Sequence, residues 1–183
     1  PRFPCAAINY CLEEAFVEPD ELDAVAFYDN PLLSLDRTIK CLIAATPRTE
    51  EQWLRAAPTA LGVKPLVGEW VRRQLKCDVQ MVFVEHHMSH AASAFYPSPF
   101  HRAAILTVDG VGEWATTTIA IGDKNNLEIK EEIMFPHSLG LLYSSFTYYT
   151  GFKVNSGEYK LMGLAPYGSP IYQDIIKKEL IDI

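Results

Sequence analysis

Three side chains in the middle of the chain have the types and spacing of a metal site. His86 and His90 are four residues apart, so on a helix both imidazoles project from one face and can share a cation. Asp109 ends an apolar stretch further along and offers a carboxylate as a third ligand, with room left for water or substrate. Spacing alone would also fit ordinary hydrogen-bonded histidines. Because a carboxylate follows the histidine pair, a metal site is the first hypothesis.

The neighbouring residue types narrow the chemistry. A zinc protease helix needs a glutamate directly after its first histidine, and here that position is His87, so the protease class fits poorly. His87 lies about 100° around a helix from His86 and is interpreted as a group that supports the ligands or contacts substrate. His101 and His137 have no ligand-like spacing, and we expect ordinary polar roles for both.

The turn at residues 109–113 allows two interpretations. It is either a tight hairpin turn that uses glycines for their backbone freedom, or a phosphate-binding turn between two strands. In the second case Gly110 and Gly112 let backbone N–H groups approach anionic oxygens while Asp109 orients a cation. A cation beside phosphate groups is consistent with both the turn and the histidines.

A glycine-bearing segment at residues 155–168 also has two interpretations. Asn155 and Ser156 are good helix-capping residues, so the segment is either a cap with a short helix or a loop that holds a nucleotide. In the nucleotide interpretation Glu158 accepts hydrogen bonds from ribose hydroxyls and Lys160 balances phosphate charge. The capping interpretation leaves both charged residues without a role.

The elements that must position these groups follow a mixed pattern of helices and strands. Apolar periodicity and Gly or Pro breaks predict a strand that delivers the chain to the histidines and an antiparallel meander that contains Asp109. Helices are expected at residues 5–15, 34–45, from Thr49, at 65–75, 89–95, 139–149 and from 173 onward, and strands at 22–28, 80–84, 103–108, 116–121 and 127–134.

Composition limits the function classes. The chain has 183 residues, 49% of them hydrophobic, which is ample for a core. Its 16 basic and 23 acidic residues give a net charge of −7 without a basic, aromatic-bearing cluster, so duplex DNA is not an expected partner. Four cysteines without C-x-x-C spacing predict reduced, mostly buried thiols. No apolar stretch approaches a membrane span, which together with the cysteines predicts a cytoplasmic protein.

Taken together, the three clusters resemble the N-terminal domain of the carbamoyltransferases of nodulation-factor and antibiotic biosynthesis. The matching segments are His-His-Met-Ser-His-Ala-Ala-Ser-Ala-Phe at 86–95, residues 107–113 and residues 157–168, and the resemblance extends over nearly the whole chain. That domain is similar to the tRNA threonylcarbamoyladenosine transferase domain, which implies an α/β fold of the actin, sugar-kinase and Hsp70 ATPase type. That fold has two ribonuclease-H-like halves. The resemblance implies that residues 1–100 form the remainder of the first half, and that residues 101–183 form the start of the second half.

The resemblance implies a reaction and roles. In the family, carbamoyl phosphate and ATP give a carbamoyladenylate in a separate domain, and the actin-like domain passes the carbamoyl group to a hydroxyl of a small-molecule or sugar acceptor. The expected cation is iron(II) or another divalent metal. By position, the implied metal ligands are His86, His90 and Asp109, the implied base is His87, and the implied nucleotide-binding residues are Gly110, Gly112, Glu158 and Lys160.

The same resemblance implies that parts of the site lie elsewhere. The chain begins at Pro1 without a methionine and lacks the family's first phosphate-facing hairpin, a later metal-binding aspartate and the adenylate-forming domain, so we expect it to be inactive alone. Two alternatives are a tRNA threonylcarbamoyladenosine-type transferase and a non-catalytic nucleotide-binding module. Residues 89–95 and 158–168 favour the small-molecule carbamoyltransferases over the first, and the complete set of His86, His90 and Asp109 argues against the second.

Overall fold

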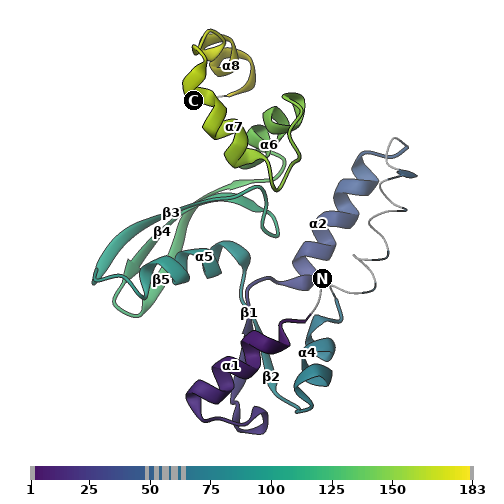
Figure 1. Ribbon diagram of the computed structural model, residues 1–183, viewed down its shortest axis with the longest axis vertical. Coiled ribbons are helices and arrows are strands. Elements are labelled where there is room, and N and C mark those ends of the chain that lie inside the picture. Colours follow the sequence, from purple (N-terminus) through teal and green to yellow (C-terminus); the bar gives the residue numbers. More distant parts are fainter. Residues whose placement is uncertain are drawn as a thin grey trace.

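The computed structural model shows a mixed α/β protein in which a parallel and an antiparallel sheet lie apart (Figure 1). It describes residues 3–47 and 65–181, together with 50, 51, 54, 58 and 62. The helix expected from Thr49 falls on a stretch most of which is outside the described residues. The helices are α1 (Cys5–Ala15), α2 (Pro31–Ala44), α4 (Val67–Leu75), α5 (His86–Phe95), α6 (Leu139–Tyr149), α7 (Glu158–Leu164) and α8 (Gln173–Leu180).

The first sheet pairs β1 (Ala24–Phe27) with β2 (Gln80–Phe83) in parallel, with Ala24 opposite Gln80. Parallel neighbours require a long crossover, and here the chain leaves β1 through α2 and returns through α4 before β2. The apolar stripe of α4 is buried at Val67 and Val71. This unit therefore brings the chain to α5 along a short strand, as the sequence predicts.

The second sheet is an antiparallel meander with the order β3–β4–β5. Its strands are β3 (Arg102–Val108), β4 (Ala115–Asp123) and β5 (Asn126–Met134). Helix α5 lies across one face of this sheet (Figure 1), and the buried core between them contains Ala91 and Phe95 of the helix, with Ile105 and Ala120 of the strands. The helix that carries the histidines thus rests on the sheet that carries Asp109.

The chain then leaves the sheet through α6, α7 and α8, which lie at the end of the molecule that holds the C-terminus (Figure 1). One-turn 3-10 helices occur at Pro19–Glu21 and Ala165–Tyr167. The α6 helix begins at its cap Ser138, whose hydroxyl accepts the N–H of Leu141 at 3.0 Å. No helix in the described part of the chain is both long and apolar enough to cross a bilayer.

The predicted elements within the described residues are confirmed, although two helices begin three residues earlier than expected. Helix α2 begins at Pro31 because the Asn30 side chain accepts the N–H groups of Leu32 and Leu33. Helix α5 begins at His86, whose N–H finds an acceptor on Glu113. The α/β class is confirmed, whereas the ribonuclease-H-like halves and their boundary at residue 100 stay predictions.

The thiol prediction was wrong about burial. All four cysteines are free, as expected, but Cys5 and Cys11 are exposed and Cys41 and Cys77 are only partly buried. The physical reason for the first two is that α1 has no buried residue at all, so its thiols have no core to enter.

Candidate metal centre

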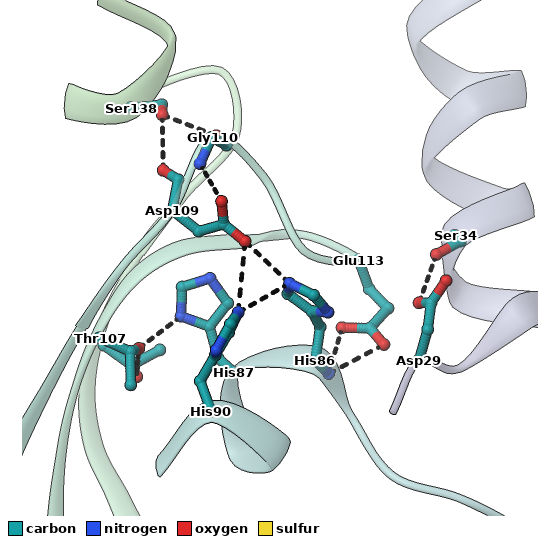
Figure 2. A network of polar contacts seen from close by, with 11 residues as sticks. Asp29, Ser34, His86, His87, His90, Thr107, Asp109, Gly110, Glu113 and Ser138 are labelled. Atoms are coloured by element: carbon teal, nitrogen blue, oxygen red, sulfur yellow. Dashed lines mark hydrogen bonds and ion pairs between the residues drawn. The ribbon is translucent and has the colours of Figure 1, made fainter. Parts of the chain in front are cut away.

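The structure brings the three predicted ligands together at one point (Figure 2). The Nε2 atom of His86 lies 2.8 Å from Oδ2 of Asp109, and Nε2 of His90 lies 3.5 Å from the same oxygen. The two imidazole nitrogens are 3.0 Å apart. Two helix residues and one strand-end residue therefore present three donor atoms to a common centre.

Helix α5 presents the histidines because its other face is buried. Residues four apart form a stripe of His87, Ala91 and Phe95 against the sheet, and this leaves His86 and His90 on an adjacent face. The rings of His86 and His90 stack edge to face with centroids 4.5 Å apart. The amphipathic pattern of the helix thus aims both rings toward Asp109.

Asp109 directly follows β3, and its surroundings favour the ionised carboxylate. Partial burial works to raise its pKa, but the 2.6 Å hydrogen bond from the Gly110 N–H and the neighbouring imidazoles outweigh burial and hold that pKa below its ordinary value. One carboxylate oxygen accepts the Gly110 N–H and the other faces the histidines. The side chain therefore stays ionised at neutral pH with one oxygen available to a cation.

The donor set fits a divalent cation. Bonds of about 2.1 Å place neighbouring donor atoms on one cation roughly 3–3.5 Å apart. Two of the separations found here, 3.0 and 3.5 Å, lie in this range, and the third, 2.8 Å, is slightly shorter. Two imidazoles and one carboxylate are a donor set used by both catalytic zinc and non-haem iron(II) sites. The His90 side chain is half exposed and that of Asp109 is 38% exposed, so one side of the centre is open to a further ligand.

His87 lies inside the protein rather than at this open side. The residue is 2% exposed, and its Nδ1 is 2.7 Å from the Thr107 hydroxyl (Figure 2). The Thr107 hydroxyl in turn lies 2.6 Å from the Thr118 hydroxyl. Burial first, and then the neighbouring His86, lower the pKa of His87, so the ring is neutral at pH 7. Its Nε2 has no hydrogen-bond partner among the described residues. The role of base stays a prediction, beside an evident role in anchoring α5.

The glycines of the turn serve the local structure in different ways. A Cβ on Gly112 would lie 3.0 Å from the His87 ring and 3.1 Å from the His86 side chain, so the missing side chain lets the turn close over α5. Its N–H donates to the Ala115 carbonyl at 2.9 Å, as the Gly110 N–H donates to Asp109. Phosphate binding by these two N–H groups stays a prediction, and it would have to replace internal hydrogen bonds.

Glu158, one of the predicted nucleotide residues, lies beside the middle of α6, away from the turn. The Glu158 carboxylate accepts the N–H groups of Asn155 and Gly157 at 2.9 and 3.2 Å and the Ser144 hydroxyl at 3.1 Å. The Asn155 hydrogen bond is the leading reason why the pKa of Glu158 lies below its ordinary value. Lys160 is exposed, and its ammonium lies 5.9 Å from the centre of the Tyr159 ring. Nucleotide binding by Glu158 and Lys160 stays a prediction.

Sequence reasoning missed the residues that hold the centre in place. The Ser138 hydroxyl reaches the carbonyl oxygens of Gly110 and Asp109 at 2.7 and 3.3 Å, which fixes the start of α6 against the turn. Gly140 permits this approach, because a Cβ there would lie 2.7 Å from the Gly110 nitrogen. Glu113 accepts the backbone N–H of His86 (Figure 2) and that of Asn30. Only Glu113 had a signal in the sequence, its place within the 109–113 motif.

Comparison with known proteins identifies a family over nearly the whole chain. The family model described as "Carbamoyltransferase N-terminus" matches residues 2–183. An uncharacterized protein of Synechocystis sp. is 50% identical over 189 residues, which cover 99% of this chain and 31% of that protein. The nodulation protein NolNO of Sinorhizobium fredii is 34% identical over 189 residues, covering 99% of this chain and 26% of that protein. The nodulation protein NolO of Bradyrhizobium diazoefficiens is 38% identical over 104 residues, which cover 54% of this chain and 18% of that protein. The chain spans about a third or less of the length of these relatives.

Proposed function

This chain belongs to the carbamoyltransferase N-terminal family, and we propose that it forms the cation-binding part of an ATP-dependent O-carbamoyltransferase. The proposed reaction moves the carbamoyl group of a carbamoyladenylate, made from carbamoyl phosphate and ATP, to a hydroxyl of a small-molecule or sugar acceptor. The observation that carries this proposal is the convergence of His86, His90 and Asp109 on one point.

The proposed transfer forms one bond and breaks one. The acceptor oxygen bonds to the carbamoyl carbon, the bond from that carbon to the adenylate phosphate oxygen breaks, and AMP leaves with the electron pair. The proton of the acceptor hydroxyl passes to a base. A bound divalent cation, with iron(II) as the first candidate, supplies Lewis acidity toward the carbamoyl carbonyl and the phosphate.

The chain's own residues have distinct proposed roles in this reaction. His86, His90 and the ionised Asp109 hold the cation, since their donor atoms already lie 2.8–3.5 Å apart. His87 is the candidate base because its ring is neutral at pH 7 and its Nε2 has no partner among the described residues. That role requires the acceptor proton to reach the ring of a residue that is 2% exposed.

The proposed nucleotide contacts set a length requirement for the ligand. Ser138 at the start of α6 touches Gly110, and Ser144 on the same helix touches Glu158. Six residues of helix rise by roughly 9 Å, so a ligand that reaches from Gly110 to Glu158 has to be elongated, as a nucleotide is. Under this proposal Gly110 and Gly112 lie near phosphate, and Glu158 and Lys160 lie near the rest of the nucleotide.

Metal titration of the 183-residue chain tests the proposal. We expect one Fe²⁺ or Co²⁺ ion per chain, lost in the variant His86→Ala and retained in the matched control His101→Ala, which removes an exposed histidine outside the cluster. Equal metal content in all three proteins would refute the ligand assignment. Nucleotide binding without any His86-dependent metal would instead support the alternative of a non-catalytic nucleotide-binding module.

A further inference from the structure

Glu113 is a buried carboxylate that the proposed reaction does not use. Its side chain is 5% exposed, although it lies in the connection between β3 and β4 only four residues after Asp109. One carboxylate oxygen accepts the backbone N–H of Asn30 at 2.7 Å, and the two oxygens accept the backbone N–H of His86 at 3.1 and 3.0 Å. Burial raises the pKa of this carboxyl group, and segments far apart in the sequence meet at it.

Both N–H donors lie where a helix follows a parallel strand. Asn30 stands between β1 and α2, and His86 is the first residue of α5 after β2. Helix starts leave backbone N–H groups without partners, so a buried carboxyl oxygen that accepts them is favourable there. The cap residue of α5, Glu85, makes no side-chain capping bond, and Glu113 supplies an acceptor from the second sheet instead.

His86 is consequently held at both ends by a single turn. Asp109 contacts its ring nitrogen at 2.8 Å, and Glu113 accepts its backbone N–H (Figure 2). A cation bound here would be held by the ring of His86 and by Asp109 in place of their mutual contact. The contact from Glu113 uses the backbone N–H of His86, which is not a ligand atom, so it would be compatible with a bound cation.

We propose that Glu113 is a positioning residue for the cation centre: it fixes the backbone of His86 before the cation arrives and ties that backbone to the start of α2. This inference rests on the proposed metal-binding function of His86, His90 and Asp109. Ligands fixed in advance lose less freedom on binding, and residues that orient metal ligands are typically worth about 10–100-fold in metal affinity. A carboxylate that only stabilised the fold would change stability without a matching change in affinity.

Co²⁺ affinity and the absorption spectrum of bound Co²⁺ in the 183-residue chain provide the test. We expect Glu113→Ala to weaken Co²⁺ binding by about tenfold or more and to change the spectrum. Glu113→Gln keeps the size and one acceptor oxygen, so it recovers part of the affinity and covers the case in which the alanine variant does not fold. Val71→Ala, which opens the buried α4 contact away from the centre, controls for lost stability and should keep the affinity within about twofold.

The outcomes distinguish failure of the positioning role of Glu113 from failure of the metal site. Wild-type affinity and spectrum in both Glu113 variants, together with lost binding in His86→Ala, would overturn the positioning role and leave the metal site standing. An equal loss of affinity in Val71→Ala would also overturn it, because the effect would then follow general stability. A wild-type chain that binds no Co²⁺ would overturn the metal site and the positioning role together.

Discussion

The metal cluster and the loop before α7 both have the residue types of ligand sites, but the structure uses their polar atoms differently. In the cluster, the free oxygen of Asp109 and two imidazole nitrogens face one another at 2.8–3.5 Å. In the loop, the Glu158 carboxylate accepts two backbone N–H groups and a hydroxyl of its own surroundings. The cluster directs its donor atoms at a shared point, whereas the loop directs its carboxylate at its own backbone.

Packing against the sheet preorganises the cluster, whereas the loop lacks this support. Asp109 directly follows strand β3, and Ala91 and Phe95 of helix α5 pack against that sheet. This packing sets the distance between the histidines and Asp109. The loop before α7 has no comparable buried support, since α7 has no buried residue. The same kinds of residues therefore form a ligand centre in one region and a loop brace in the other.

The largest expected effect contrasts the two carboxylates directly. Asp109→Ala should weaken Co²⁺ binding by more than about 100-fold, above the 10–100-fold typical of groups that only orient ligands. Glu158→Ala should leave Co²⁺ affinity within about twofold, because that carboxylate is engaged in its own loop. Calorimetric titration of both variants measures the difference. A similar loss in both would break the distinction between the two regions.

The hydroxyl network beneath the cluster should show a smaller effect, on stability. Thr107→Val leaves His87 Nδ1 and the Thr118 hydroxyl buried without their partner, and we expect it to lower the free energy of unfolding by about 2–3 kcal/mol. Thr117→Val on the paired strand is the matched control. The Thr117 hydroxyl has no hydrogen-bond partner among the described residues, so its removal should be neutral or stabilising. Urea unfolding compares them, and equal losses would contradict the network.

Alanine substitutions at two glycines compare the start of α6 with α7 through the free energy of unfolding. Gly140→Ala should lower the free energy of unfolding by about 1–2 kcal/mol, because its Cβ would collide with the backbone of Asp109 and Gly110. Gly163 in α7 has nothing within 4 Å of an added Cβ, so Gly163→Ala should stabilise the helix by about 0.5–1 kcal/mol. Thermal unfolding of both variants gives the signs. Stabilisation by Gly140→Ala would show that α6 does not press on the turn.

The smallest expected effect is local and depends on pH. The pKa of Glu158 lies below the ordinary value of 4.5, chiefly through the Asn155 N–H, so its stabilisation is present above that value. It is lost as pH falls through the lowered pKa. Amide exchange of Asn155 and Gly157 should therefore become faster, relative to unfolded peptide, on acidification of the wild type. Glu158→Gln should remove this pH dependence, and an unchanged profile in that variant would assign the effect to another group.

Much of the fold was predictable because local signals agree with the tertiary structure. Apolar periodicity located the described helices and strands, and the i, i+4 spacing placed His86 and His90 on one helical face. The starts of α2 and α5 were less predictable. The Asn30 cap is a local signal, but the acceptor for His86 comes from Glu113, 27 residues away. The burial of His87 also depends on a sheet that local patterning does not place against α5.

The family, the mixed α/β class and the three candidate ligands could be inferred from residue types and their spacing. Those features depend on residue types and short spacings, because local backbone geometry sets the direction in which each side chain points. The folded molecule was needed to show that the ligands meet at one point, that Glu113 contacts the starts of two helices, and that Glu158 accepts hydrogen bonds within its own loop. The physical reason is that these outcomes depend on which buried faces pack together, and such packing pairs segments that the sequence keeps apart.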